Sequence, residues 1–78
     1  MRFLDIKSKN KMDKIIVYLT KNEAEELYQS LHKILIDENL HEHILSEDYT
    51  KELRICIYNN QNLSQFDERS KTLIIEDK

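Results

Sequence analysis

The chain has 78 residues, of which 35% are charged and 40% hydrophobic, and its formal net charge is −3 at pH 7. A chain this short has room for one domain, residues 1–78, and buries only ~60% of the surface that its unfolded form exposes. It contains no Gly and no Pro, which excludes the glycine-dependent phosphate loops of dinucleotide-binding proteins and P-loop NTPases. Its turns must therefore be made by Asn, Asp, Ser and Lys.

The charge is unevenly distributed. Residues 1–14 carry five basic and two acidic side chains, a balance of +3, whereas residues 21–52 carry three basic and nine acidic, a balance of −6. Direct nucleic-acid binding requires a clustered basic face, so we expect none. Frequent Ile, Lys and Asn are typical of AT-rich coding and favour a small bacterial or phage-like protein.

A single cysteine, Cys56, excludes an internal disulfide and a cysteine-based zinc finger. The N-terminus MRFLDIKSKNK is too polar for a signal peptide, and no apolar run approaches the ~18 residues of a membrane span. We therefore expect a cytoplasmic protein that has no membrane partner and no cofactor.

Residues 14–20, KIIVYLT, give the clearest strand signal because they are β-branched and aromatic. Alternation places Ile15, Val17 and Leu19 on one face of this strand. Ile16 and Tyr18 lie on the other face. Both faces are at least partly apolar, which predicts a central strand or one whose outer face meets a partner.

A helix is predicted from about residue 21 to residue 36. Thr20 and Glu23 have the spacing of a capping box, and Leu19 with Ala24 has that of a hydrophobic staple. An apolar stripe then follows at helical intervals; it comprises Ala24, Leu27, Tyr28, Leu31, Ile34 and Leu35. Asn39 is the expected left-handed residue at the end of this helix.

Residues 40–45 and 52–58 read as two strands joined by the polar turn SEDYTK, which predicts an antiparallel hairpin. A second helix is predicted from about 63 to 74, with Asn62 as its cap; residues 69–78 also fit a terminal strand. Residues 1–11 fit either a peripheral edge strand or an extension. The order β-α-β-β-α predicts an α+β two-layer sandwich, in which two helices cover one face of a three- or four-stranded antiparallel sheet.

The stretch LHEHIL invites a metal-site interpretation, because His41 and His43 project to the same side of a strand. The further ligands would have to come from His32, Glu47 or Asp48. A structural zinc normally has four protein ligands, often thiolates, and Glu42 points away from the two histidines. We therefore expect no metal site and no catalytic residue, and the histidines are better explained as surface residues, with a pH-sensitive contact as an alternative.

The outer face of the predicted sheet is the more informative feature. Its aromatic, imidazole and guanidinium groups are typical of protein interfaces, and the predicted partner-binding residues are Ile16, Tyr18, His41, His43, Arg54, Cys56 and Tyr58. An alternative is that the chain's own N-terminal segment or tail covers this face.

Three functions follow from these features. The first is a non-enzymatic protein-binding module, such as a regulator, inhibitor or immunity-type protein, that docks through the outer sheet face or the acidic helix. The second is a homodimeric structural protein that pairs through the sheet face. The third is a histidine-based metal-binding protein.

Overall fold

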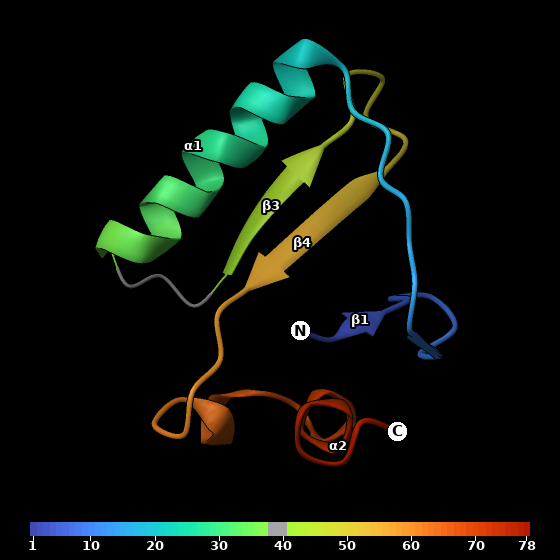
Figure 1. Ribbon diagram of the computed structural model, residues 1–78, viewed down its shortest axis with the longest axis vertical. Coiled ribbons are helices and arrows are strands. Elements are labelled where there is room, and N and C mark those ends of the chain that lie inside the picture. Colours follow the sequence, from blue (N-terminus) through green and yellow to red (C-terminus); the bar gives the residue numbers. More distant parts are fainter. Residues whose placement is uncertain (38–40) are drawn as a thin grey trace. The chain divides into compact units, whose positions relative to one another are not determined.

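The computed structural model describes residues 1–37 and 41–78. The described chain divides into two compact units, one formed by Tyr18–Tyr58 and the other by Met1–Val17 together with Asn59–Lys78. Helices and antiparallel strands both occur (Figure 1), so the expected α+β class is confirmed. Within the described ranges, none of the helices combines the length and the apolar character needed to cross a bilayer.

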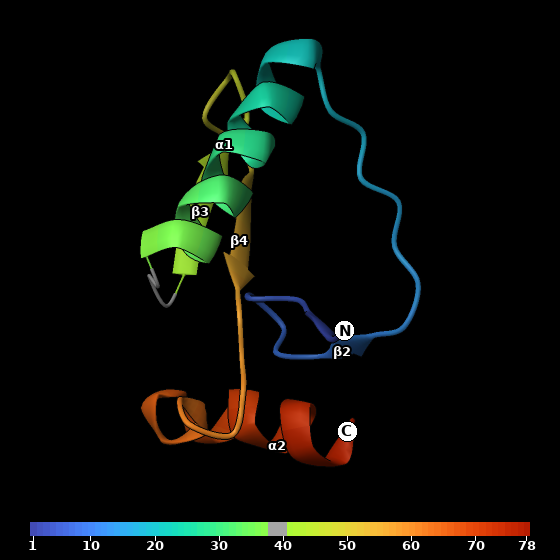
Figure 2. The same cartoon turned by 60° about the vertical axis from the view of Figure 1, so that its left-hand side comes forward.

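The unit Tyr18–Tyr58 is a helix packed on a hairpin. Helix α1 (Lys21–Asp37) lies along the antiparallel pair of β3 (His41–Leu45) and β4 (Glu52–Cys56), and packs chiefly on β3 (Figures 1 and 2). Ile34 of α1 is 3% exposed and Ile44 of β3 is 4% exposed. The predicted hairpin is confirmed; residues 38–40, which include the predicted helix end at Asn39 and the first residue of the predicted strand, lie outside the described residues.

The predicted capping box begins α1 as expected. The Thr20 Oγ1 accepts from the Glu23 backbone N–H at 3.1 Å, and Glu23 Oε1 accepts from the Thr20 backbone N–H at 2.9 Å. The second Glu23 oxygen accepts from the Glu47 backbone N–H at 2.8 Å. These contacts lower the pKa of Glu23, with the Thr20 N–H as the largest cause and the Glu47 N–H as the next. They also join the start of α1 to the turn that follows β3.

The hairpin turn is organised by Asp48. Its Oδ1 accepts from the hydroxyls of Ser46 and Thr50 at 2.7 Å each and from the Thr50 backbone N–H at 3.1 Å. These bonds, with the Ser46 hydroxyl first, lower the pKa of Asp48 to about 2. Tyr49 adopts a left-handed backbone with φ 60°. In a chain without glycine, the turn therefore places an ordinary residue where glycine is normally favoured.

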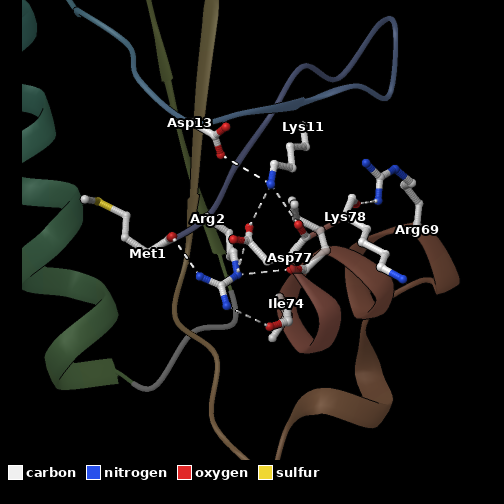
Figure 3. Close-up of polar contacts among 9 residues, drawn as sticks. Met1, Arg2, Lys11, Asp13, Arg69, Ile74, Asp77 and Lys78 are labelled. Atoms are coloured by element: carbon white, nitrogen blue, oxygen red, sulfur yellow. Dashed lines mark hydrogen bonds and ion pairs between the residues drawn. The ribbon is translucent and has the colours of Figure 1, made fainter.

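The other unit contains the two-stranded ribbon of β1 (Phe3–Leu4) and β2 (Lys11–Met12), the short 3-10 helix η1 (Leu63–Gln65) and helix α2 (Glu68–Glu76). Cations from the ribbon lie at the end of α2 (Figure 3): Arg2 Nε donates to the Leu73 carbonyl at 3.0 Å, and Lys11 Nζ donates to the Asp77 carbonyl at 2.8 Å. Positive charge is favourable at the carbonyl end of a helix dipole. Leu73, at 4% exposure, is the buried residue of α2.

The left-handed C-cap Asp77, with φ 56°, closes α2 by donating its N–H to the Leu73 carbonyl at 2.9 Å. Lys9 also has a positive φ, of 66°. The expectation that Asp and Lys replace glycine in turns is confirmed at these two positions, whereas Tyr49 was not foreseen.

Two predicted elements need correction. The predicted helix from 63 to 74 is interrupted, because Phe66 and Asp67 are extended between η1 and α2. Asp67 is the effective cap, since its side chain accepts from the Ser70 N–H at 2.9 Å. The Asn62 side chain instead accepts from the Asn59 N–H at 2.9 Å. The alternative of a terminal strand within residues 69–78 is wrong, because Glu68–Glu76 is helical.

The second correction concerns residues 14–20, which form no strand in the structure. Among the described residues there are two sheets of two strands each, and the predicted three- or four-stranded sheet is not observed. β-propensity reflects packing against neighbouring strands rather than an intrinsic backbone preference. The segment has the composition of a strand but lacks a neighbour in the described chain.

Candidate protein-binding face

The hairpin brings four of the predicted site residues together. Its register places His41 opposite Cys56 and His43 opposite Arg54, and all four side chains are exposed. We call the side of the hairpin that carries these four residues the outer hairpin face. Their alternation with half-buried or buried neighbours, which point toward α1, was predicted from the sequence and is confirmed by the burial patterns of β3 and β4.

Glu52 links the two basic groups of this face. The Glu52 Oε1 accepts from Arg54 Nη2 at 3.1 Å and also contacts His43 Nδ1. The pKa of Glu52 is lowered, first by its hydrogen bond with His43 and second by its hydrogen bond with Arg54. The ring of His43 also meets the ring of His41 edge to face, with centroids 4.9 Å apart.

Glu52 and Leu45 belong to this face although the prediction did not name them. Both are exposed, and the register pairs them directly at the turn end of the hairpin. The missed signal is the alternation itself, because Glu52 lies two residues before Arg54, and Leu45 two residues after His43. The face therefore combines imidazole, guanidinium, thiol, aliphatic and carboxylate groups.

Cys56 is not activated as a nucleophile. Partial burial raises the pKa of its thiol, which the nearby Arg54 guanidinium opposes only in part. Reactive thiols have a lowered pKa, because the thiolate is the nucleophile. Cys56 therefore supplies a small polarisable group at the end of β4.

The histidine pair gathers no third ligand among residues 1–37 and 41–78. His32 is exposed on α1, and within residues 1–37 and 41–78 no group of three or more His, Cys, Asp or Glu side chains could hold a metal ion. Two imidazoles alone fall short of the ligand sets that bind zinc in proteins.

The remaining predicted site residues lie outside the hairpin. Ile16 and Tyr18, at 77% and 86% exposure, lie in the unpaired extended segment. Tyr58 lies two residues after the end of β4, and its side chain is 40% exposed. The sequence prediction assigned Ile16 and Tyr18 to the outer face by placing residues 14–20 in the same sheet as the hairpin, and Tyr58 by extending the second hairpin strand to residue 58. In the structure residues 14–20 form no strand and β4 ends at Cys56.

A second surface of the same unit is an acidic groove between α1 and β3, with a volume of about 670 Å³. Four of its lining residues are carboxylates: Glu25, Glu26, Glu42 and Glu47. Lys33 contributes a cation, whose Nζ lies 4.0 Å from Glu42 Oε1. This groove is the structural counterpart of the acidic helix surface expected from the sequence.

Comparison with known proteins gives no further guide to this surface. No protein-family model, no curated protein and no solved structure matches the chain.

Proposed function

We propose that this chain is a non-enzymatic protein-binding module, of the kind used as a small regulator, inhibitor or immunity-type protein, and that it docks through the outer hairpin face. The observation that carries the proposal is that His41, His43, Arg54 and Cys56 occupy one exposed face of a hairpin. Interfaces are enriched in arginine and in groups that combine an apolar body with a polar edge.

Arg54 is the residue most suited to anchor a partner. Glu52 holds its guanidinium through a hydrogen bond of 3.1 Å. Because this bond already restricts the rotamers of Arg54 in the free protein, less side-chain entropy is lost when a partner binds. The guanidinium has five N–H donors, so it can bind a carboxylate or carbonyl of the partner while Glu52 holds it.

The proposal is tested by affinity capture from the native host with three baits. Arg54→Glu reverses the charge of the outer hairpin face, and Lys21→Glu makes the same change at an exposed position at the start of α1. We expect one protein to be retained by the wild type and by Lys21→Glu, and to be at least ~10-fold depleted with Arg54→Glu, as for a lost interfacial arginine.

Two outcomes oppose the proposal. Equal retention of the same protein by Arg54→Glu would place the binding site elsewhere on the chain. Retention of no protein above the level of a blank matrix would argue against a binding module. Both variants are first compared with the wild type by circular dichroism, so that a difference in capture reports binding rather than folding.

A homodimeric protein is the second candidate function. It is favoured by the absence of a second strand partner for β4 among the described residues. An uncovered strand edge presents unpaired backbone groups to a second strand.

A further inference from the structure

The outer edge of β4 is open to another strand. In an antiparallel pair, residues alternate between those that exchange hydrogen bonds with the partner strand and those whose backbone groups point away. The Ser46 N–H donates to the Lys51 carbonyl at 2.9 Å. Counting from this bonded pair, the backbone groups of Glu52, Arg54 and Cys56 point away from β3, and β3 is the one strand that pairs with β4 among the described residues.

Helix α1 extends an apolar flank toward this same edge. The acidic groove is lined on the α1 side by residues that include Glu25, Gln29 and Lys33. Its other lining includes residues of β3 but none of β4, so the groove lies on the β3 side of α1. With 3.6 residues per turn, Tyr28, Leu31 and Leu35 fall on the opposite side of the buried Ile34 row. These three are exposed large hydrophobic side chains, and they form an apolar flank on the β4 side.

The chain also carries a segment with the composition of a strand that has no strand partner among the described residues. Residues 14–20 run as a drawn-out trace outside any helix or strand (Figure 1). The exposed fraction alternates along them: 38% at Ile15, 77% at Ile16, 48% at Val17, 86% at Tyr18 and 38% at Leu19. Alternation with period two is the signature of a strand with one protected face. The segment therefore keeps the two-faced character that the sequence predicted.

We propose that residues 14–20 of a second copy add to the open edge of β4 as an antiparallel strand. The register that fits best places Tyr18 opposite Arg54 and Ile16 opposite Cys56. These are the residues of β4 whose backbone groups point outward, so the two pairs form four interchain backbone hydrogen bonds. Ile16 and Tyr18 then extend the outer hairpin face of the acceptor copy.

The inner face of this pairing is aliphatic throughout. Val17 lies opposite Ile55, and Leu19 lies opposite Leu53. The half-buried Ile55 and Leu53 of β4 face α1, so the added strand presents Val17 and Leu19 to the apolar flank of Tyr28, Leu31 and Leu35. No like charges oppose each other, and Tyr18 lies within reach of the Arg54 guanidinium for a cation–π contact.

The donor is a second copy because the acceptor's own segment is held elsewhere. The N–H of Thr20 donates to Glu23 and its carbonyl accepts from the Ala24 N–H at 2.9 Å. In the register above, Thr20 would lie opposite Glu52, beyond β4 and therefore two strand spacings, ~10 Å, from β3. In its own chain, one Glu23 carboxylate accepts from the N–H groups of both Thr20 and Glu47, at 2.9 and 2.8 Å, which keeps Thr20 beside the turn that follows β3.

A single substitution tests the register, because the chain has one native cysteine. In Ile16→Cys, the new thiol lies opposite Cys56 of the other copy, at a Cα separation of ~5.5 Å that suits a disulfide. Val17→Cys is the matched control, since its side chain points to the other face of the added strand. Mild oxidation is carried out above pH 8.5, because the Cys56 thiol has a raised pKa.

We expect Ile16→Cys to give a covalent dimer joined between positions 16 and 56, at least ~10 times more abundant than any dimer from Val17→Cys or the wild type. Non-reducing electrophoresis with peptide mass mapping gives this result. A disulfide between 16 and 56 of the same chain would overturn the second copy as donor. Dimers joined through Cys56 of both chains, or no excess over Val17→Cys, would overturn the strand addition. The strand addition does not rest on the proposed binding function. Capture of a host protein tests that function, and cross-linking of the pure chain tests the strand addition, so either result can be negative without the other.

Discussion

Replacing Ile44 by Ala is expected to destabilise the unit Tyr18–Tyr58 by about 3 kcal/mol. Ile44 is 4% exposed in β3, beneath α1, so nearly its whole side chain is withdrawn from water. The substitution removes about three methylene equivalents at ~0.8 kcal/mol each, and a term for incomplete collapse of the cavity is added. A chain of this length has a total stability of only ~4–12 kcal/mol, so the loss is a large fraction of it.

The assay is urea unfolding followed by far-ultraviolet circular dichroism, with the free energy of unfolding obtained by linear extrapolation. Ile36→Ala is the matched control, because Ile36 lies on α1 at 62% exposure. This control is expected to change the free energy of unfolding by less than ~0.5 kcal/mol. Equal effects of the two substitutions would refute the assignment of Ile44 to the core between α1 and the hairpin.

Two further predictions concern the cap and the turn of the same unit. Thr20→Ala should lower the free energy of unfolding by about 1 kcal/mol, because it removes the side-chain acceptor of the Glu23 N–H. Thr20→Ser keeps this acceptor and should change the free energy of unfolding by only a few tenths of a kcal/mol. An unchanged free energy of unfolding in the alanine variant would show that the cap contributes nothing. Asp48 has a pKa lowered to about 2 by its bonds to Ser46 and Thr50. Its contribution to stability is therefore complete above pH ~4 and is lost as the pH falls toward 2. Asp48→Asn should flatten the dependence of the melting temperature on pH in that range, and parallel pH profiles of variant and wild type would contradict this assignment.

The sequence was most informative where the structure-forming interaction is local. Thr20 and Glu23 are three residues apart, and their capping box appears as predicted. Alternation similarly placed His41, His43, Arg54 and Cys56 on one face of the hairpin, because side chains two residues apart in a strand share a face. Glu52 obeys the same rule and could have been found by it.

Long-range pairing was the point at which sequence reasoning failed. Residues 14–20 have the strongest strand composition in the chain, yet they are unpaired in the structure. A strand becomes part of a sheet only when another strand supplies backbone partners, and composition does not say which strand that is, or whether it lies in the same chain. The N-terminal ribbon is a related case, because only the fold brings Arg2 and Lys11 to the end of α2 (Figure 3).

By itself, the sequence determined the α+β class, the start of α1, the hairpin and the alternation of its two faces. Each of these depends on residues close together in the chain, whose geometry follows from the helical or strand repeat. Tertiary structure alone decided that Glu52 joins His43 to Arg54, that the acidic groove lies between α1 and β3, and that β3 is the one strand pairing with β4 among the described residues. These features depend on which elements pack together, a choice made by burial and backbone pairing over the whole chain.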